Sequence, residues 1–227
     1  MERSTDMDDA ISNAIEGIYS AFADAPKPRQ LMGCQHCIGI LDDSALTSLE
    51  LRAIPSRILA PYVWKAMLTV GTEEDFFYFL PRILELVATD PDFSVDTEVV
   101  GSRVGSTDVS AWPTHRSHAL FVYLGVVVRR AVAAEDFAGF DAWICAIALM
   151  NVEVMSFLKE IEPSRNGILE YFTHNAKTLP TGRLANAFWE TPGPGHDNVV
   201  AWFHSESIAG LLREEYGYVF PDTKQAE

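Results

Sequence analysis

The residues best suited to chemistry in this 227-residue sequence are the two cysteines of the segment Cys34-x-His36-Cys37. The C-x-x-C spacing brings two sulfur atoms to the same side of a turn, where both can bind one metal ion. A structural zinc site needs two further ligands, and His115 and His118 can supply them from one face of a helix. We expect no cofactor, and zinc bound by Cys34, Cys37, His115 and His118 is the alternative.

The same pair of cysteines has two other interpretations. A C-x-x-C pair is a redox site in thioredoxin-like proteins, but there it lies in a β-α-β unit, which the surrounding sequence does not indicate. Cysteines also pack as small apolar residues without reacting. The third cysteine, Cys145, lies between Ile144 and Ala146 and is interpreted as a core residue. With only 3 cysteines, a secreted disulfide framework is not expected.

No catalytic motif accompanies these cysteines. The sequence contains no G-x-S-x-G nucleophile elbow and no H-E-x-x-H metalloprotease motif. Its glycine pairs, Gly101 with Gly105 and Gly193 with Gly195, lack a P-loop lysine and the dinucleotide-binding pattern. These absences leave the question of enzymatic activity open, and they favour a protein without it.

Net charge is the most unusual property of the composition. Asp and Glu number 32 against 17 Lys and Arg, so the formal net charge is −15. Such a surface repels nucleic-acid phosphates and anionic membranes, and it attracts basic proteins. The residues that we expect to contact a basic partner are Asp42, Asp43, Glu73, Glu74 and Asp75. Two other interpretations of the acidic residues are solubility and the stabilisation of helix N-termini.

The sequence shows no targeting or membrane-spanning segment. Its first nine residues are acidic and lack the apolar stretch of a signal peptide. The longest apolar run, Ala119 to Val128, is far shorter than the roughly 20 residues that a membrane-spanning helix requires. We therefore expect a cytoplasmic protein that binds neither nucleic acid nor a membrane.

Apolar residues recur every three or four positions through most of the chain, which indicates amphipathic helices. Helices are expected at residues 6–23, 44–51, 62–70, 72–87, 96–104, 115–134, 140–158, 166–177, 182–189 and 199–216. A buried strand is the alternative for the apolar run inside the sixth of these. Pro81 should kink or split its helix, and another helix should break near Asn151.

The predicted fold is therefore all-α. We expect an irregular array of about nine or ten short antiparallel helices without a regular sheet, because alternating strands and hairpin turns are absent from the sequence. No linker separates the chain into parts, so a single domain over residues 1–227 is predicted. Its polar end, at about 222–227, is expected to be a disordered tail.

One part of the chain resembles a group of uncharacterised bacterial proteins. The resemblance rests on the C-x-H-C segment, on Tyr62-Val-Trp-Lys-Ala-Met, on Gly71 and on the element Phe79-Leu-Pro-Arg-x-Leu-Glu-Leu86. It covers about a quarter of the chain, and Trp112-Pro113 extends it. The resemblance implies a bacterial origin and a helical fold, but no activity. It also adds weight to the two cysteines, which lie in the shared segment.

The function that we expect from the sequence is protein binding without catalysis. A small, acidic, helical protein is suited to an immunity or antitoxin role, in which carboxylates cover the basic cleft of a toxin. The alternative is a zinc-binding helical protein or a metal-dependent enzyme that uses Cys34 and Cys37. A third hypothesis is a homo-oligomeric structural protein, such as a homodimer, that assembles through exposed aromatic side chains of the first or the C-terminal helix.

Overall fold

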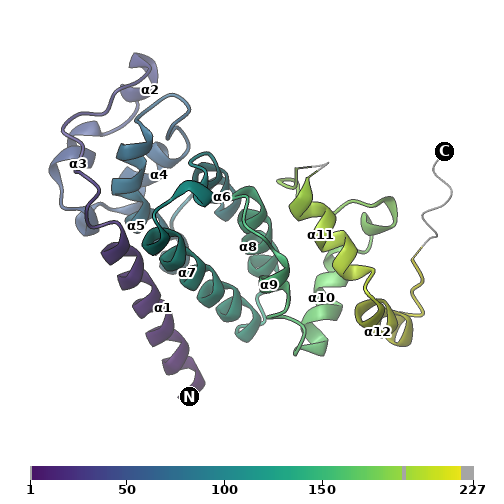
Figure 1. Cartoon of the computed structure of the whole chain (residues 1–227). Helices are drawn as coiled ribbons and strands as arrows, with labels where there is room; N and C mark the ends of the chain where they lie inside the picture. The colour runs from purple at the N-terminus through teal and green to yellow at the C-terminus, as the bar shows by residue number, and fades with distance from the viewer. Residues whose placement is uncertain (1, 191–192, 221–227) are drawn as a thin grey trace. The chain divides into compact units, whose positions relative to one another are not determined.

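The computed structural model in Figure 1 describes the backbone of residues 2–190 and 193–220, and side chains from residue 6 onward. This part of the chain is helical and contains no strand, which confirms the predicted all-α class. The α-helices are α1 (Glu2–Ala21), α2 (Gln35–Ile38), α3 (Asp43–Ser48), α4 (Ser56–Val63), α5 (Glu73–Thr89), α6 (Thr97–Gly105), α7 (Thr114–Ala133), α8 (Phe137–Leu149), α9 (Met155–Leu158), α10 (Arg165–Asn175), α11 (Pro194–Phe203) and α12 (Glu206–Tyr216). Short 3-10 turns lie at Leu51–Ala53, Val109–Ala111 and Leu179–Thr181.

The chain divides into two compact units, an N-terminal unit of residues 1–127 and a C-terminal unit of residues 128–227. The division falls inside α7. The single domain that the sequence predicts stays a prediction, and the predicted tail at 222–227 lies outside the described residues. Among the described residues, no helix combines the length and the apolar character that crossing a membrane would need.

Helix α5 is the central element of the N-terminal unit, and its start is determined by local sequence. Thr72 caps the helix by accepting a hydrogen bond from the Asp75 N–H, and the Asp75 carboxylate accepts the Thr72 N–H at 2.7 Å. This capping box satisfies two backbone donors that the helix itself leaves unpaired. The helix continues through the buried Pro81, so the expected split does not occur.

Helix α1 and the first part of α7, both in the N-terminal unit, contact α5. Helix α1 packs on it directly, and the Tyr19 hydroxyl donates to the Glu85 carboxylate at 2.5 Å. Helix α7 is joined to it through Tyr123, whose buried hydroxyl donates to the Leu84 carbonyl at 2.7 Å. Because α1 and α7 are both supported by α5, the surface between them can remain open.

The C-terminal unit is built around α8, which contacts α10 and α11. Its interior is aromatic: Tyr171 lies within 5.2 Å of both Phe140 and Phe203, measured between ring centres. Asn175, fully buried at the end of α10, accepts the Ala185 N–H at 2.8 Å through its side-chain oxygen. This bond holds the segment that follows, which is made of turns and bends.

Three predicted helices differ from the structure. Residues 64–70 form turns because Met67 has a left-handed backbone (φ 60°), and the helix of this region lies earlier, at α4. Residues 182–189 are not helical, since Gly182 is left-handed and Asn175 accepts the Ala185 N–H in place of a helical carbonyl. The helix expected at 199–216 is divided into α11 and α12 at Ser205.

Other predictions for the helices are confirmed. The apolar run at 119–128 is helical and belongs to α7, so the strand alternative was wrong. The break near Asn151 occurs as predicted, because Asn151 adopts a left-handed conformation (φ 58°) between α8 and α9.

Candidate functional site

A pocket with exposed carboxylates lies where the end of α1 meets the start of α5 and α7. Its volume is about 450 Å³. The residues that line this acidic pocket are Asp24, Ala25, Pro26, Glu73, Glu74, Phe77 and Arg116. Three carboxylates and an aromatic ring therefore surround a single guanidinium.

Arg116 forms one wall of the acidic pocket and is mostly buried. Its guanidinium carbon lies 4.8 Å from the ring centre of Phe22 and 5.1 Å from that of Phe77, which are cation–π distances. Its Nη2 donates to the Asp24 carboxylate at 2.6 Å. This hydrogen bond from Arg116 is the main reason that the pKa of Asp24 lies below its usual value.

Glu73 and Glu74 form the opposite side of the acidic pocket. Both side chains are exposed in the first turn of α5, where the helix dipole favours negative charge. Within the described part of the chain, neither carboxylate has a hydrogen bond or an ion pair, whereas Asp24 already holds Arg116. These two carboxylates are therefore free to bind a cation from outside.

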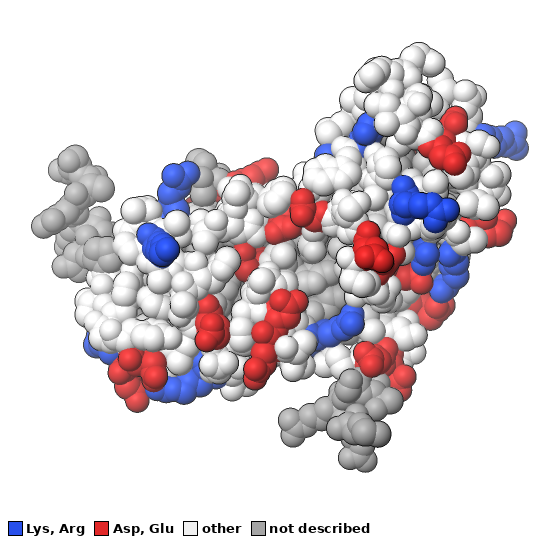
Figure 2. Space-filling view, turned by 180° about the vertical axis from the view of Figure 1, so that it is seen from behind, with Lys and Arg blue, Asp and Glu red and all other residues white. Residues whose placement is uncertain are grey.

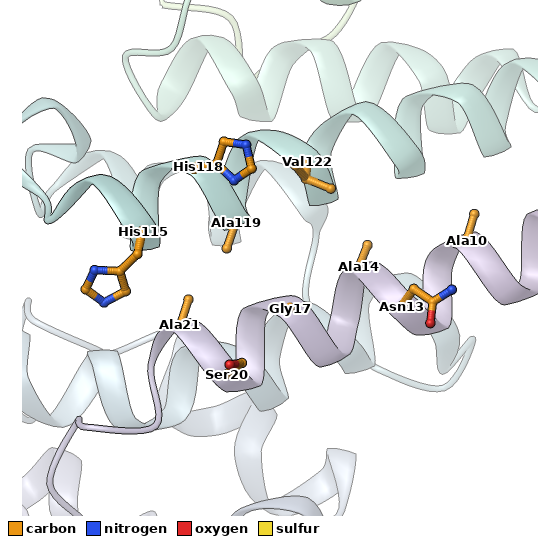
Figure 3. A pocket seen from close by; sticks show the side chains of 10 residues that line it. All are labelled: Ala10, Asn13, Ala14, Gly17, Ser20, Ala21, His115, His118, Ala119 and Val122. Atoms are coloured by element: carbon orange, nitrogen blue, oxygen red, sulfur yellow. The ribbon is translucent and has the colours of Figure 1, made fainter.

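A groove runs between α1 and α7 and has a volume of about 460 Å³ (Figure 3). The side that α1 contributes consists of small residues at helical spacing, and α7 contributes two histidines and two apolar residues. The lining residues are Ala10, Asn13, Ala14, Gly17, Ser20 and Ala21 on α1, and His115, His118, Ala119 and Val122 on α7. In Figure 3 the methyl groups of Ala14 and Ala21 point toward α7, and Ala119 points toward α1.

The depth of this groove comes from the small side chains of α1. Gly17 is exposed near its middle, and a Cβ atom added there would have no neighbour within 4 Å. Ala14 and Ala21, one turn to either side, are buried but fill little volume. Val122 on α7 remains 45% exposed, although it is a large apolar side chain. The groove is thus an apolar hollow that the N-terminal unit leaves unfilled.

The groove and the acidic pocket adjoin one another. Ala21 lines the groove, and Asp24, three residues later, lines the pocket. On the other side His115 lines the groove, and Arg116, the next residue, lines the pocket. We call the two together the α1–α7 surface, an apolar groove with carboxylates at one end.

The acidic residues predicted to bind a partner have different roles in the structure. Asp42 caps α3 by accepting the Ala45 N–H at 3.0 Å, and Asp75 belongs to the capping box of α5. Asp43 lies half-buried in the first turn of α3. Glu73 and Glu74 line the acidic pocket instead, so their role differs from that of the capping residues. Figure 2 shows red carboxylates and blue basic side chains intermingled on the face in view, with no single broad acidic patch there.

The four residues predicted to bind zinc are not brought together. Cys34 and Cys37 lie at the start and within α2, whereas His115 and His118 line the α1–α7 groove. Among the residues whose side chains are described, no three His, Cys, Asp or Glu side chains are grouped so that they could hold a metal ion. The reason is the fold: α7 is supported by α5, and α2 is attached to the turn at residues 66–71.

A buried polar cluster in the C-terminal unit was missed by the sequence analysis. Asp141 on α8 is 2% exposed; its carboxylate accepts the Asn186 amide at 2.9 Å and lies 3.8 Å from the His174 Nε2. Burial raises the pKa of Asp141, although Asn186 and His174 oppose the shift. The sequence signal was an aspartate within the apolar segment from Phe140 to Ile147.

Comparison of the chain with protein-family models, curated proteins and solved structures finds no significant match. The resemblance to uncharacterised bacterial proteins therefore stays a prediction.

Proposed function

We propose that this chain is a protein-binding protein, and that its α1–α7 surface, which has no catalytic role, takes up a basic, amphipathic helix of a partner. The observation that carries the proposal is the junction of an apolar groove with a pocket whose exposed carboxylates, Glu73 and Glu74, have no partner among the described residues. The groove alone or the pocket alone would not specify the partner. Together they select a partner helix that carries both an apolar stripe and a positive charge.

The dimensions of the groove suit a helix. From Ala10 to Ala21 the lining of α1 extends over roughly 17 Å, which is about three helical turns. Small residues such as Gly17 let a second helix approach closely, and partners that lay an apolar helix face into a groove recur among peptide-binding proteins. An apolar stripe of the partner would cover Val122, which is otherwise exposed.

The charges around the groove favour a basic partner. Glu73 and Glu74 lie at one end, and the exposed Asp6 and Asp9 lie on α1 beyond Ala10 at the other. Arg116 shows how the acidic pocket holds a guanidinium, with aromatic rings on its faces and a carboxylate at its edge. A second cation, supplied by the partner, would meet the two glutamates. Complementary charge of this kind increases the rate of association and selects the partner.

Binding of a designed peptide tests the proposal directly. The probe is a helical peptide of about 18 residues, or about five turns, with an Ala/Leu stripe and Lys/Arg on the opposite face. A peptide of the same composition in scrambled order, without the stripe, is its control. Titration calorimetry should show binding of the first peptide that weakens as salt increases, and no binding of the second.

Two substitutions locate the binding site. Gly17→Leu fills the groove and should weaken binding at least about tenfold, or about 1.4 kcal/mol. Gly210→Leu is the matched control, because Gly210 also lies within a helix and a Cβ there has open space. Glu74→Lys should weaken binding to a similar extent, whereas Glu170→Lys, with the same net charge, should not. Equal affinities for all four variants would contradict the proposal.

The partner class that the sequence suggests is a basic toxin, with this chain as an immunity or antitoxin-like protein. This finer proposal is supported by the net charge of −15 and by Glu73 and Glu74 in the acidic pocket, which have no partner among the described residues. Its test is co-expression with a basic toxin encoded beside this chain in its own genome. Wild type and Gly210→Leu should restore growth, and Gly17→Leu should not. Growth arrest in the presence of wild type would contradict the finer proposal.

A further inference from the structure

The segment that contains Cys34 and Cys37 is hydrogen-bonded to another part of the N-terminal unit. The Cys34 N–H donates to the Thr69 carbonyl at 2.8 Å, and the Gly71 N–H donates to the Met32 carbonyl at 2.7 Å. Gly33 makes this approach possible, because a Cβ at that position would lie 2.2 Å from the Thr69 oxygen. The backbone at Cys34, the residue before α2, is therefore held against the turn at Thr69.

The two thiols lie on one helical turn and differ in exposure. Cys34 is exposed and free, while Cys37 is half-buried. The Cys34 carbonyl accepts the Ile38 N–H at 2.9 Å, which closes the turn that carries both residues. This places an accessible sulfur in front of a shielded one, as a nucleophilic and a resolving thiol would be placed.

The surroundings of Cys34 favour its ionised form. The N–H groups of Cys37 and His36, followed by the Cys37 thiol, lower the pKa of the Cys34 thiol. Thiolate, not thiol, is the form that attacks a disulfide.

Exposed apolar side chains belong to the segments that meet at this pair. Met32 lies two residues before Cys34, Ile40 lies three after Cys37, and Leu68 lies on the turn bonded to Cys34. Each of the three is more than half exposed, which is unusual for large apolar residues. A partner with an apolar segment would cover them and would then lie beside the Cys34 sulfur.

We propose that Cys34 and Cys37 form a dithiol site that exchanges with disulfide bonds in apolar segments of other polypeptides. The Cys34 thiolate attacks one sulfur of the substrate, forms a mixed disulfide and releases the other sulfur as a thiolate. The Cys37 thiol then gives up its proton, attacks the Cys34 sulfur, and releases the second substrate thiolate. The protein dithiol is oxidised to a disulfide, the substrate disulfide is reduced to two thiols, and the two protons pass to them. This inference does not rest on the α1–α7 surface.

Trapping of the mixed disulfide tests the order of the two thiols. The reduced full-length protein is mixed with excess oxidised glutathione, and intact mass is measured after acid quenching. Wild type should lose the mass of two hydrogens, whereas Cys37→Ser should gain one glutathione, mapped to Cys34. Cys34→Ser should gain it several-fold more slowly. If wild type keeps both thiols, or if the two variants react at the same rate, the proposal is wrong.

A peptide substrate tests the apolar part of the proposal. The probe is a disulfide-linked pair of short peptides with apolar residues on both sides of each cysteine. Leu68→Ser should slow its reduction several-fold and leave the reaction with oxidised glutathione unchanged. Val219→Ser, which removes an equally exposed apolar side chain from the C-terminal unit, is the control. If Leu68→Ser and Val219→Ser react alike with the peptide, an apolar polypeptide is not the substrate.

Metal analysis distinguishes the dithiol site from a zinc site. Protein purified without a chelator should contain far less than one equivalent of zinc, and added zinc should be removed by a weak chelator. One equivalent of zinc that protects Cys34 and Cys37 from oxidised glutathione would overturn the proposal, because metal-bound thiolates would then be the resting state.

Discussion

The candidate functional groups of the N-terminal unit and the buried polar groups of the C-terminal unit have different surroundings. In residues 1–127, the candidate functional groups lie at the surface beside hollows or apolar side chains: Glu73 and Glu74 at the acidic pocket, and Cys34 near exposed apolar residues. In residues 128–227, Asp141 and Asn175 are buried, and each has a hydrogen bond within its own unit. The comparison indicates that polar groups of the first kind are available to a ligand, whereas those of the second kind maintain the fold.

The largest effect that we expect is on the interior of the C-terminal unit. Phe203 is fully buried against Tyr171, Trp202 and Phe172, and Phe203→Ala should lower the free energy of unfolding by about 3–5 kcal/mol. Glu73→Gln should leave it within about 0.5 kcal/mol, since the side chain is exposed and without a partner among the described residues. Urea denaturation followed by circular dichroism measures both. A comparable loss of stability in both variants would break the comparison between the units.

A smaller effect concerns the pH dependence that Asp141 contributes. Its pKa is raised by burial, so between its unfolded and folded pKa values the native state binds more protons, and stability falls as pH rises. Asp141→Asn lacks this contribution. From about pH 4 upward, Asp141 is ionised in the unfolded chain but still protonated in the folded protein. Over this range, the free energy of unfolding of the variant should rise relative to that of wild type by about 1.4 kcal/mol for each pH unit.

The measurement is urea denaturation of wild type and Asp141→Asn at several pH values between about 4 and 7. Asp24→Asn serves as the exposed control, because the pKa of Asp24 is shifted in the opposite direction by Arg116. Stability differences that do not change with pH for Asp141→Asn would show that its carboxyl group is not perturbed, and the contrast between buried and exposed carboxylates would be lost.

The smallest expected effect is that of replacing a helical glycine by alanine, and it should change the free energy of unfolding equally in both units. Gly17 in α1 and Gly210 in α12 each have open space for a Cβ atom. Gly17→Ala and Gly210→Ala should each raise the free energy of unfolding by about 0.5–1 kcal/mol, because alanine loses less backbone freedom in a helix. Thermal denaturation measures the change. A loss of stability at Gly17 would mean that the groove is filled by the protein itself, which would also weaken the proposed binding site.

What could be predicted from the sequence was what neighbouring residues determine. The helix break near Asn151, which was predicted, depends on the conformation of one residue. The caps at Asp42 and at Thr72 with Asp75 likewise join groups only three residues apart. Apolar periodicity was sufficient for the all-α class, because it depends only on spacing along the chain.

Contacts between distant residues could not be predicted. The pairing of His115 and His118 with Cys34 and Cys37 assumed a contact that the fold does not make, because α7 and α2 are attached to different elements. The helix expected at 182–189 does not form because Asn175, ten residues before Ala185, takes its N–H. The acidic pocket was predicted in part: Glu73 and Glu74 were selected by charge, but Asp24 and Arg116 join them only through folding.

The aromatic wall behind the acidic pocket has an optical consequence. Trp112 is nearly buried and lies edge-on to Phe77, with 5.3 Å between ring centres, while Phe77 itself lines the pocket. Indole emission responds to charges and polarity close to the ring, so a cation arriving beside Phe77 would alter the fluorescence of Trp112. The protein thus contains an intrinsic fluorophore, Trp112, separated from the proposed binding site by the ring of Phe77. Its emission can report ligand binding without an added label.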